Sequence, residues 1–155
     1  IRDSSKTFNP VYGYKELEAI FGDRRPESAK ELEEAVRAVR ARKLPDPKVL
    51  PNAGSFFKNP VVTRTKMLHL LEETPSLVSY PLGGARAKIA AGWLIEACGL
   101  KGKRMGQAGV YERQALILVN YGGATGAEIK ALAEEVARNV KYRFGVELEP
   151  EPVIL

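Results

Sequence analysis

The chain of 155 residues is poor in the residues that build metal centres and disulfides. It contains one cysteine, Cys98, and one histidine, His69. A single cysteine excludes an intramolecular disulfide and argues against a cysteine-based metal site. One histidine argues equally against a histidine-rich metal site and a Ser-His-Asp triad. We therefore predict no metal site and expect His69 to be a surface or boundary residue and not a ligand.

Long apolar runs and nucleotide-binding glycine motifs are also missing. No apolar stretch is long enough to cross a bilayer, and the first residues do not resemble a signal peptide, which predicts a cytoplasmic location and no membrane contact. Neither GxGxxG nor a P-loop occurs, and Gly122-Gly123 has the wrong context for either. Because repeats, low-complexity segments and linkers are absent as well, we predict one domain over residues 1–155.

The composition that is present suits a small globular protein with an anionic ligand. Hydrophobic residues make up 45% of the chain, enough for a core. The 24 basic and 19 acidic residues give a net charge of +5. This moderate excess suits an anionic small molecule as well as a polyanion.

Apolar periodicity and capping signals predict an α+β fold, with a small mixed or antiparallel sheet packed against several helices. The S-x-x-E and T-x-x-E forms at Ser28 and Thr125 predict two helix starts. We expect helices at residues 15–21, 28–43, 65–73, 89–97 and 125–144, and strands at 108–111, 115–120 and 146–149, with weaker alternation at 77–80.

Residues 40–60 combine cations, prolines, a Gly-Ser step and two phenylalanines, which neither a helix nor an ordinary strand favours. Pro45 and Pro47 end the preceding helix and leave Lys43 at its C-terminus. Gly54 permits a sharp turn or close approach of a ligand, and places the Ser55 hydroxyl on a tight wall. If residues 56–57 are extended, their two rings point to opposite faces and seal a site from water.

Residues 52–60, Asn-Ala-Gly-Ser-Phe-Phe-Lys-Asn-Pro, are preceded by Lys-Leu-Pro-Asp-Pro at 43–47. Together they resemble the signature of the UDP-N-acetylenolpyruvoylglucosamine reductases, flavoenzymes of peptidoglycan precursor synthesis. Further blocks that resemble this family lie at residues 91–102, 115–125 and 143–151. In the family a flavin-binding region comes first, so the resemblance implies that this chain is the C-terminal, substrate-binding portion and lacks the N-terminal FAD-binding domain.

The resemblance implies a reduction. The family converts UDP-N-acetylglucosamine enolpyruvate to UDP-N-acetylmuramate with FAD, which NADPH reduces. It assigns the proton donor to the serine at Ser55 and a carboxylate-polarising role to the glutamate at Glu151. The family's active-site arginine corresponds to Arg2, here preceded by Ile1 where tyrosine is usual.

Substrate contacts carry over one position at a time. Tyr14 and Lys43 match family positions that hold the diphosphate, and Asn59 and Gln114 match amides that contact the nucleotide. Tyr80 matches the tyrosine that closes over substrate in the loop-bearing class. The FAD contacts lie mainly outside this chain, and we expect a monomer.

Two alternatives stay open. A basic nucleic-acid-binding domain would use Arg37, Arg40, Arg42, Lys43 and residues 101–104, although the aromatic residues are not interleaved with these cations as a stacking surface requires. Steep salt dependence would distinguish such binding from UDP-sugar binding. The second alternative is a catalytically inactive module that binds a UDP-sugar.

Overall fold

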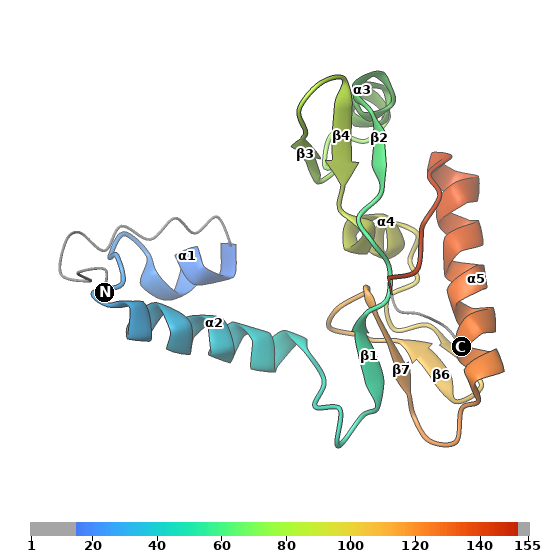
Figure 1. Ribbon diagram of the computed structural model, residues 1–155, viewed down its shortest axis with the longest axis horizontal. Coiled ribbons are helices and arrows are strands. Elements are labelled where there is room, and N and C mark those ends of the chain that lie inside the picture. The colour runs from blue at the N-terminus through green and yellow to red at the C-terminus, as the bar shows by residue number, and fades with distance from the viewer. Residues whose placement is uncertain (1–14, 152–155) are drawn as a thin grey trace, which may run out of the picture. The chain divides into compact units, whose positions relative to one another are not determined.

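The computed structural model describes residues 15–151 (Figure 1) and divides the chain into two compact units, Ile1–Leu44 and Pro45–Leu155. The first unit contains helices α1 (Lys15–Phe21) and α2 (Ala29–Lys43). Leu17 and Phe21 on α1 are buried. α2 ends where Leu44 adopts the extended conformation (φ −102°, ψ 133°) expected before a proline.

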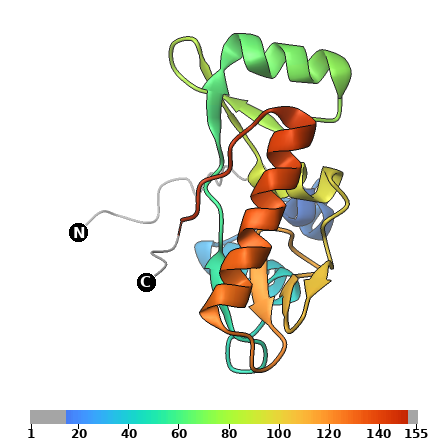
Figure 2. The same ribbon diagram turned by 90° about the vertical axis from the view of Figure 1, so that its right-hand side faces the viewer.

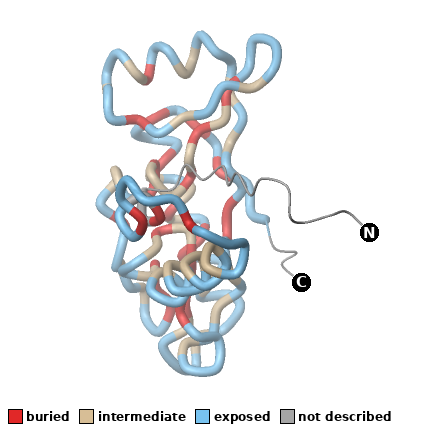
Figure 3. Tube along the Cα trace, turned by 90° about the vertical axis from the view of Figure 1, so that its left-hand side faces the viewer, coloured by how far each residue is buried: buried red, intermediate tan, exposed pale blue. Residues whose placement is uncertain are grey.

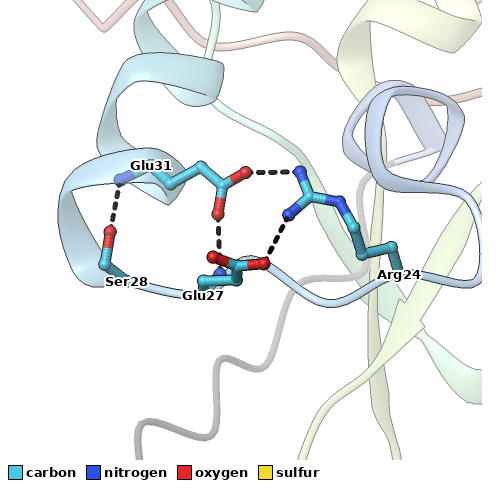
Figure 4. A network of polar contacts seen from close by, with 4 residues as sticks. All are labelled: Arg24, Glu27, Ser28 and Glu31. Atoms are coloured by element: carbon cyan, nitrogen blue, oxygen red, sulfur yellow. Dashed lines mark hydrogen bonds and ion pairs between the residues drawn. The ribbon is translucent and has the colours of Figure 1, made fainter.

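A polar network begins α2 (Figure 4). The Ser28 side chain accepts a hydrogen bond from the Glu31 amide at 3.1 Å, as predicted for an N-cap. The Glu31 carboxylate, however, accepts from the Glu27 amide at 2.6 Å and pairs with Arg24. The predicted capping box is therefore only half formed. The hydrogen bond from Arg24 holds the pKa of Glu31 below its usual value.

The second unit contains two antiparallel sheets, and it has the order β1-β7-β6-β5 in the larger of them. Ile117, Leu118 and Val119 of β7 are buried, as the run of Ile, Leu and Val predicts, and α5 packs against this sheet. The strands are β1 (Asn52–Ser55), β5 (Arg104–Met105), β6 (Ala108–Val110) and β7 (Ile117–Asn120).

The smaller sheet has the order β2-β4-β3. Helix α3 (Arg64–Glu73) packs against it, and most of α3 is exposed (the helix at the top of Figure 3). His69 on α3 is exposed beside Glu73, as expected. The strands are β2 (Val61–Thr63), β3 (Ser79–Pro81) and β4 (Arg86–Ile89).

Helix α5 (Gly126–Phe144) is the longest element and lies along the second unit (Figure 2). Its predicted capping box is complete, because Thr125 accepts from the Glu128 amide and Glu128 accepts from the Thr125 amide, both at 3.2 Å. Gly145 ends the helix in the left-handed conformation (φ 64°).

One apolar cluster joins α5, α4 (Ala91–Ala97) and both sheets. Fully burying one Val, Leu or Ile side chain in such a cluster contributes roughly 1.5–3 kcal/mol to the stability of the fold. Its most deeply buried large side chains are Ile89, Leu94, Ile95, Val110, Leu132, Val136 and Val140. The predicted α+β class, with antiparallel sheets packed against helices, is confirmed. The chain divides into two compact units, so the single domain over residues 1–155 stays a prediction.

Several segments of the structure differ from those that the sequence predicts. The helix expected at 89–97 begins at Ala91, because Ile89 belongs to β4 and its N–H donates to the Pro60 carbonyl at 2.9 Å. The strand expected at 146–149 is wrong, since those residues do not pair with any strand in the described part of the chain. Residues 52–55, for which no strand was expected, form β1, with an irregular register against β7.

The start of α4 is capped by a residue distant in sequence. Its N-cap residue, Ala90, offers no side-chain hydrogen bond. Instead the Asn59 Oδ1 accepts from the Ala91 amide at 3.0 Å. Asn59 thereby ties the connection between β1 and β2 to α4.

Close approach of a ring explains Gly109 in β6. A Cβ at this position would lie 2.6 Å from Tyr121 Cε2 and 3.3 Å from the Lys103 carbonyl. The Arg104 guanidinium stacks 3.9 Å from the centroid of the same ring, which restricts its movement. Within the described residues, no helix is both long and apolar enough to cross a membrane.

Gly109→Ala is expected to lower the free energy of unfolding by about 1–2 kcal/mol, because the Tyr121 ring must leave its place. Chemical denaturation measures this. Gly126→Ala is the matched control, since a Cβ there meets nothing within 4 Å and alanine favours the helix. Adding Tyr121→Ala should remove most of the penalty of Gly109→Ala, and an unchanged penalty would contradict this explanation.

Asn59→Ala is expected to cost about 1 kcal/mol of stability, because the Ala91 amide loses its acceptor. Asn59→Asp keeps an acceptor at Oδ1 and should retain most of the stability. Thermal or chemical unfolding of both variants tests the contact. Equal losses in the two variants would show that the side-chain oxygen does not cap α4.

Candidate functional site

Ser55 ends β1, and its side chain is exposed. It lies opposite Ile117 in the β1–β7 ladder. Just before it, the Gly54 amide donates to Asn52 Oδ1 at 2.9 Å, and Gly54 has a positive φ of 75°. This local turn produces the register shift and turns the strand at Ser55.

The peptide after Ser55 connects two distant segments. The Phe56 N–H donates to the Leu116 carbonyl at 2.8 Å, and the Phe56 carbonyl accepts from the Glu151 amide at 2.7 Å. Phe57 and Pro150 form an antiparallel bridge beside them. The backbones of the two predicted catalytic residues in this unit therefore meet at one residue, because Ser55 precedes Phe56 in the chain and the Glu151 amide is hydrogen-bonded to the Phe56 carbonyl.

The two phenylalanines are buried. Phe56 and Phe57 are 4% and 3% exposed and belong to the apolar cluster, with ring centroids 5.1 Å apart. Both rings therefore lie in the core, and the shielding of a site at Ser55 by one or both of them stays a prediction. Because the chain leaves regular extension after Ser55, the two rings meet instead of facing apart.

The segment that carries Glu151 is anchored along its length. Val146 and Leu148 are buried, and the Lys58 amide donates to the Glu149 carbonyl at 2.9 Å. Lys141 contacts the exposed Glu147 at 2.7 Å, and this hydrogen bond lowers the pKa of Glu147 and raises that of Lys141. Buried and exposed residues do alternate at 146–149, but the buried side chains anchor the segment to the core and do not form part of a strand.

Two predicted substrate amides gather at the start of α4. Asn59 Oδ1 contacts the Ala91 amide, and Gln114 Oε1 lies 3.3 Å from the position that a Cβ on Gly92 would occupy. Gln114 Oε1 also accepts from the amide of Leu116 at 3.5 Å, and the carbonyl of the same residue accepts from the Phe56 amide. Asn59 and Gln114 are therefore close to the backbone that presents Ser55 and Glu151.

The other predicted site residues belong to the smaller sheet, to the first unit or to the residues that are not described. Tyr80 is in β3, opposite Lys88, and is 51% exposed on the smaller sheet. Lys43 ends α2 in the first unit, among the basic residues of its last turn. Arg2 and Tyr14 fall outside the described residues.

A cavity of about 460 Å³ opens beside Asn59. It combines a cation, two carboxylates and apolar surface. Its lining residues are Lys58, Asn59, Pro60, Val61, Glu147, Leu148 and Glu149.

Lys88 was missed by the sequence reasoning. It lies in β4, directly opposite Tyr80. Residues 86–89 alternate polar and apolar side chains, but no strand was predicted there and the helix expected at 89–97 included Ile89.

The described residues do not fit the pyrophosphate of a flavin at the start of α5. Asn120 Oδ1 already accepts from the Gly122 and Ala124 amides, at 2.9 and 3.0 Å, and the Glu128 carboxylate occupies the Thr125 amide. A carboxylate there also repels phosphate. In the same part of the chain, no three His, Cys, Asp or Glu side chains gather to hold a metal, and burial raises the pKa of Cys98.

Comparisons with known proteins agree on one family. The model for the C-terminal domain of UDP-N-acetylenolpyruvoylglucosamine reductase matches residues 46–155, almost the whole second unit. The reductase of Chromobacterium violaceum is 59% identical over 125 residues, covering 81% of this chain and 37% of that protein. The reductase of Paraburkholderia xenovorans is 53% identical over 154 residues, covering 97% and 44%.

Among solved structures, the reductase from Thermus caldophilus is 29% identical, with a TM-score of 0.46, covering 83% of this chain and 36% of that one. This chain spans less than half the length of these curated relatives. It belongs to the UDP-N-acetylenolpyruvoylglucosamine reductase family, of which residues 46–155 are the C-terminal domain.

Proposed function

We propose that this chain is the substrate-binding and proton-donating portion of an FAD-dependent, NADPH-using reductase. The full-length enzyme would convert UDP-N-acetylglucosamine enolpyruvate to UDP-N-acetylmuramate for peptidoglycan synthesis, in the cytoplasm. The observation that carries the proposal is that Ser55 adjoins Phe56 in the chain while the Glu151 amide is hydrogen-bonded to the Phe56 carbonyl. Family membership supports it, and so does the position of Asn59 and Gln114 beside the same backbone.

Reduction of an enolpyruvyl group requires a hydride and a proton at the two alkene carbons. A reduced flavin, held outside the described residues, would supply the hydride. Hydride addition leaves an enolate conjugated with the substrate carboxylate. The Ser55 hydroxyl then gives its proton to the other alkene carbon, the enolate collapses to the lactyl ether, and solvent returns a proton to the serine oxygen.

Serine is a weak acid in water, so this role needs an environment that stabilises the departing alkoxide. Lys58 lies three residues from Ser55 and lines the cavity beside Asn59. Glu151 would polarise the substrate carboxylate and so favour the enolate. Arg2, which matches the family's active-site arginine, would add a cation at the same oxygens.

Binding of the nucleotide would use different residues. Lys43, at the C-terminus of α2, would hold the diphosphate as a point charge together with Tyr14. Asn59 has its Oδ1 engaged by the Ala91 amide, which leaves its amide nitrogen as a donor for a ligand. Gln114 would contact the nucleotide, and Tyr80 would close over the substrate.

Ser55→Ala in the full-length enzyme should leave reduction of the flavin by NADPH intact, because that half-reaction needs no proton at the enolate carbon. Reoxidation by the enolpyruvyl substrate should slow by roughly 10²–10⁴-fold, the usual cost of losing a positioned general acid. Stopped-flow absorbance of the flavin follows the two half-reactions separately.

Ser76→Ala is the matched control, since Ser76 is an exposed serine in a turn. It should leave both half-reactions unchanged. Equal slowing of both by Ser55→Ala would indicate damage to folding or flavin binding. An unchanged second half-reaction would remove Ser55 from the mechanism.

Lys43→Ala in the full-length enzyme should raise KM more than it lowers kcat, because diphosphate contacts are made in both the ground state and the transition state. Steady-state kinetics measure this. Lys30→Ala, at an exposed position of the same helix, is the control and should change neither constant. A loss confined to kcat would count against diphosphate binding by Lys43.

A further inference from the structure

Helix α4 is short, and both of its ends are capped by side chains from distant parts of the chain. It has seven residues, too few for a stable isolated helix. Its own sequence supplies neither a side-chain hydrogen bond at the N-cap nor a basic residue in the last turn. The Ala91 amide donates to Asn59, 32 residues away, and the Ala97 carbonyl accepts from Arg143, 46 residues away. The position of α4 therefore depends on two side chains outside it.

The hydrogen bond from Arg143 goes to the carbonyl at the C-terminal end of α4. The three carbonyls before that of Ala97 accept from the backbone amides of residues 98–100. The Ala97 carbonyl accepts instead from the guanidinium. A cation at a helix C-terminus also interacts favourably with the helix dipole, so Arg143 supplies both a donor and a charge that α4 lacks.

Arg143 lies in the last turn of α5, which packs against α4 (Figure 1). The ring centroids of Phe144 and Trp93 are 5.7 Å apart, which joins the two helices through apolar contact. The guanidinium carbon of Arg143 lies 5.2 Å from the centroid of the Phe144 ring. The ring therefore restricts the directions in which the guanidinium can move.

The same turn of α5 leads into the segment that ends at Glu151. Gly145 ends the helix, and the Lys66 ammonium of α3 lies 2.8 Å from the position that a Cβ on Gly145 would occupy. A second cation from another element thus reaches the C-terminus of α5. Arg143 ties α4 to the point at which the segment with Glu151 begins.

The other end of α4 lies in the candidate site. Asn59 Oδ1 contacts the Ala91 amide there, and Gln114 Oε1 lies 3.3 Å from the position that a Cβ on Gly92 would occupy. A helix of this length spans only roughly 10 Å and moves as one body. A displacement at the Ala97 end is therefore passed on to both amides.

We propose that Arg143 is a positioning residue of the site, which acts through α4. By holding the C-terminus of this helix, it fixes Asn59 and Gln114 relative to the segment that carries Glu151. This inference rests on the proposed function for the roles of those three residues. Misplacing a group that orients a substrate by about 1 Å can cost up to about 100-fold in rate, so one hydrogen bond at the far end of a short helix is enough to matter.

The test measures UDP binding to the full-length protein by calorimetry, together with steady-state and stopped-flow kinetics. Arg143→Met removes the donor and the charge but keeps an apolar stem. It should weaken UDP binding and raise KM by about 10-fold each, with little change in kcat or in flavin reduction by NADPH. Arg143→Lys still has a donor for the Ala97 carbonyl and should recover most of the affinity. Arg138→Met is the matched control, since Arg138 pairs with Glu135 on its own helix, and should change none of these values.

A double-mutant cycle distinguishes positioning through α4 from an independent effect. Changes at sites about 10 Å apart with no shared partner are normally additive. If Arg143 acts through α4, Arg143→Met should weaken UDP binding less in the Asn59→Ala protein than in the wild type, because one contact that the helix positions is already lost. Fully additive losses would overturn the proposal.

The remaining outcomes are equally decisive. A loss of stability with unchanged UDP affinity, or equal slowing of both flavin half-reactions, would assign Arg143 to folding alone. Reductase activity with an unchanged UDP affinity in Arg143→Met would sink this inference and leave the proposed function standing. The reverse result, a UDP affinity that depends on Arg143 in a protein without reductase activity, would remove the proposed reaction and leave the positioning role intact.

Discussion

The backbone of Phe56 is the junction on which the second unit depends. Its N–H and carbonyl groups bond to two segments far from it in sequence, one leading into β7 and one at the end of the described chain. Its ring, with that of Phe57, is buried in the cluster beneath both hydrogen bonds. A buried peptide whose donor and acceptor are both used fixes the two segments against each other. Any ligand site at Ser55 takes its geometry from this single residue.

Much of the fold could be predicted because local signals and tertiary packing agree. The Thr125 and Ser28 caps, the end of α2 before Pro45 and the buried run of β7 are all set by neighbouring residues. β2 and β4 were missed because strands of three or four residues are defined mainly by their partners. Residues 146–149 show the reverse case, since their alternation buries Val146 and Leu148 without a ladder.

The candidate site divides in the same way. Ser55, Glu151, Asn59 and Gln114 came from the family resemblance, and periodicity alone would not have selected any of them. That they gather near one peptide is a property of chain topology, which no local signal reports. Lys88 shows what only strand register reveals. Its place opposite Tyr80 depends on a hairpin that the sequence reasoning did not predict.

The exposure of Ser55 bears directly on mechanism. Glu151 is exposed as well, and within the described residues no cation forms an ion pair with it. An exposed hydroxyl in water has little tendency to give up a proton, so the acidity that the proposed step needs must arise when substrate binds. A diphosphate held by cations and a carboxylate laid beside Ser55 and Glu151 would exclude water from both groups. On this argument the phosphate contacts do more than hold the nucleotide, because by anchoring the substrate they create the environment in which serine can act as an acid.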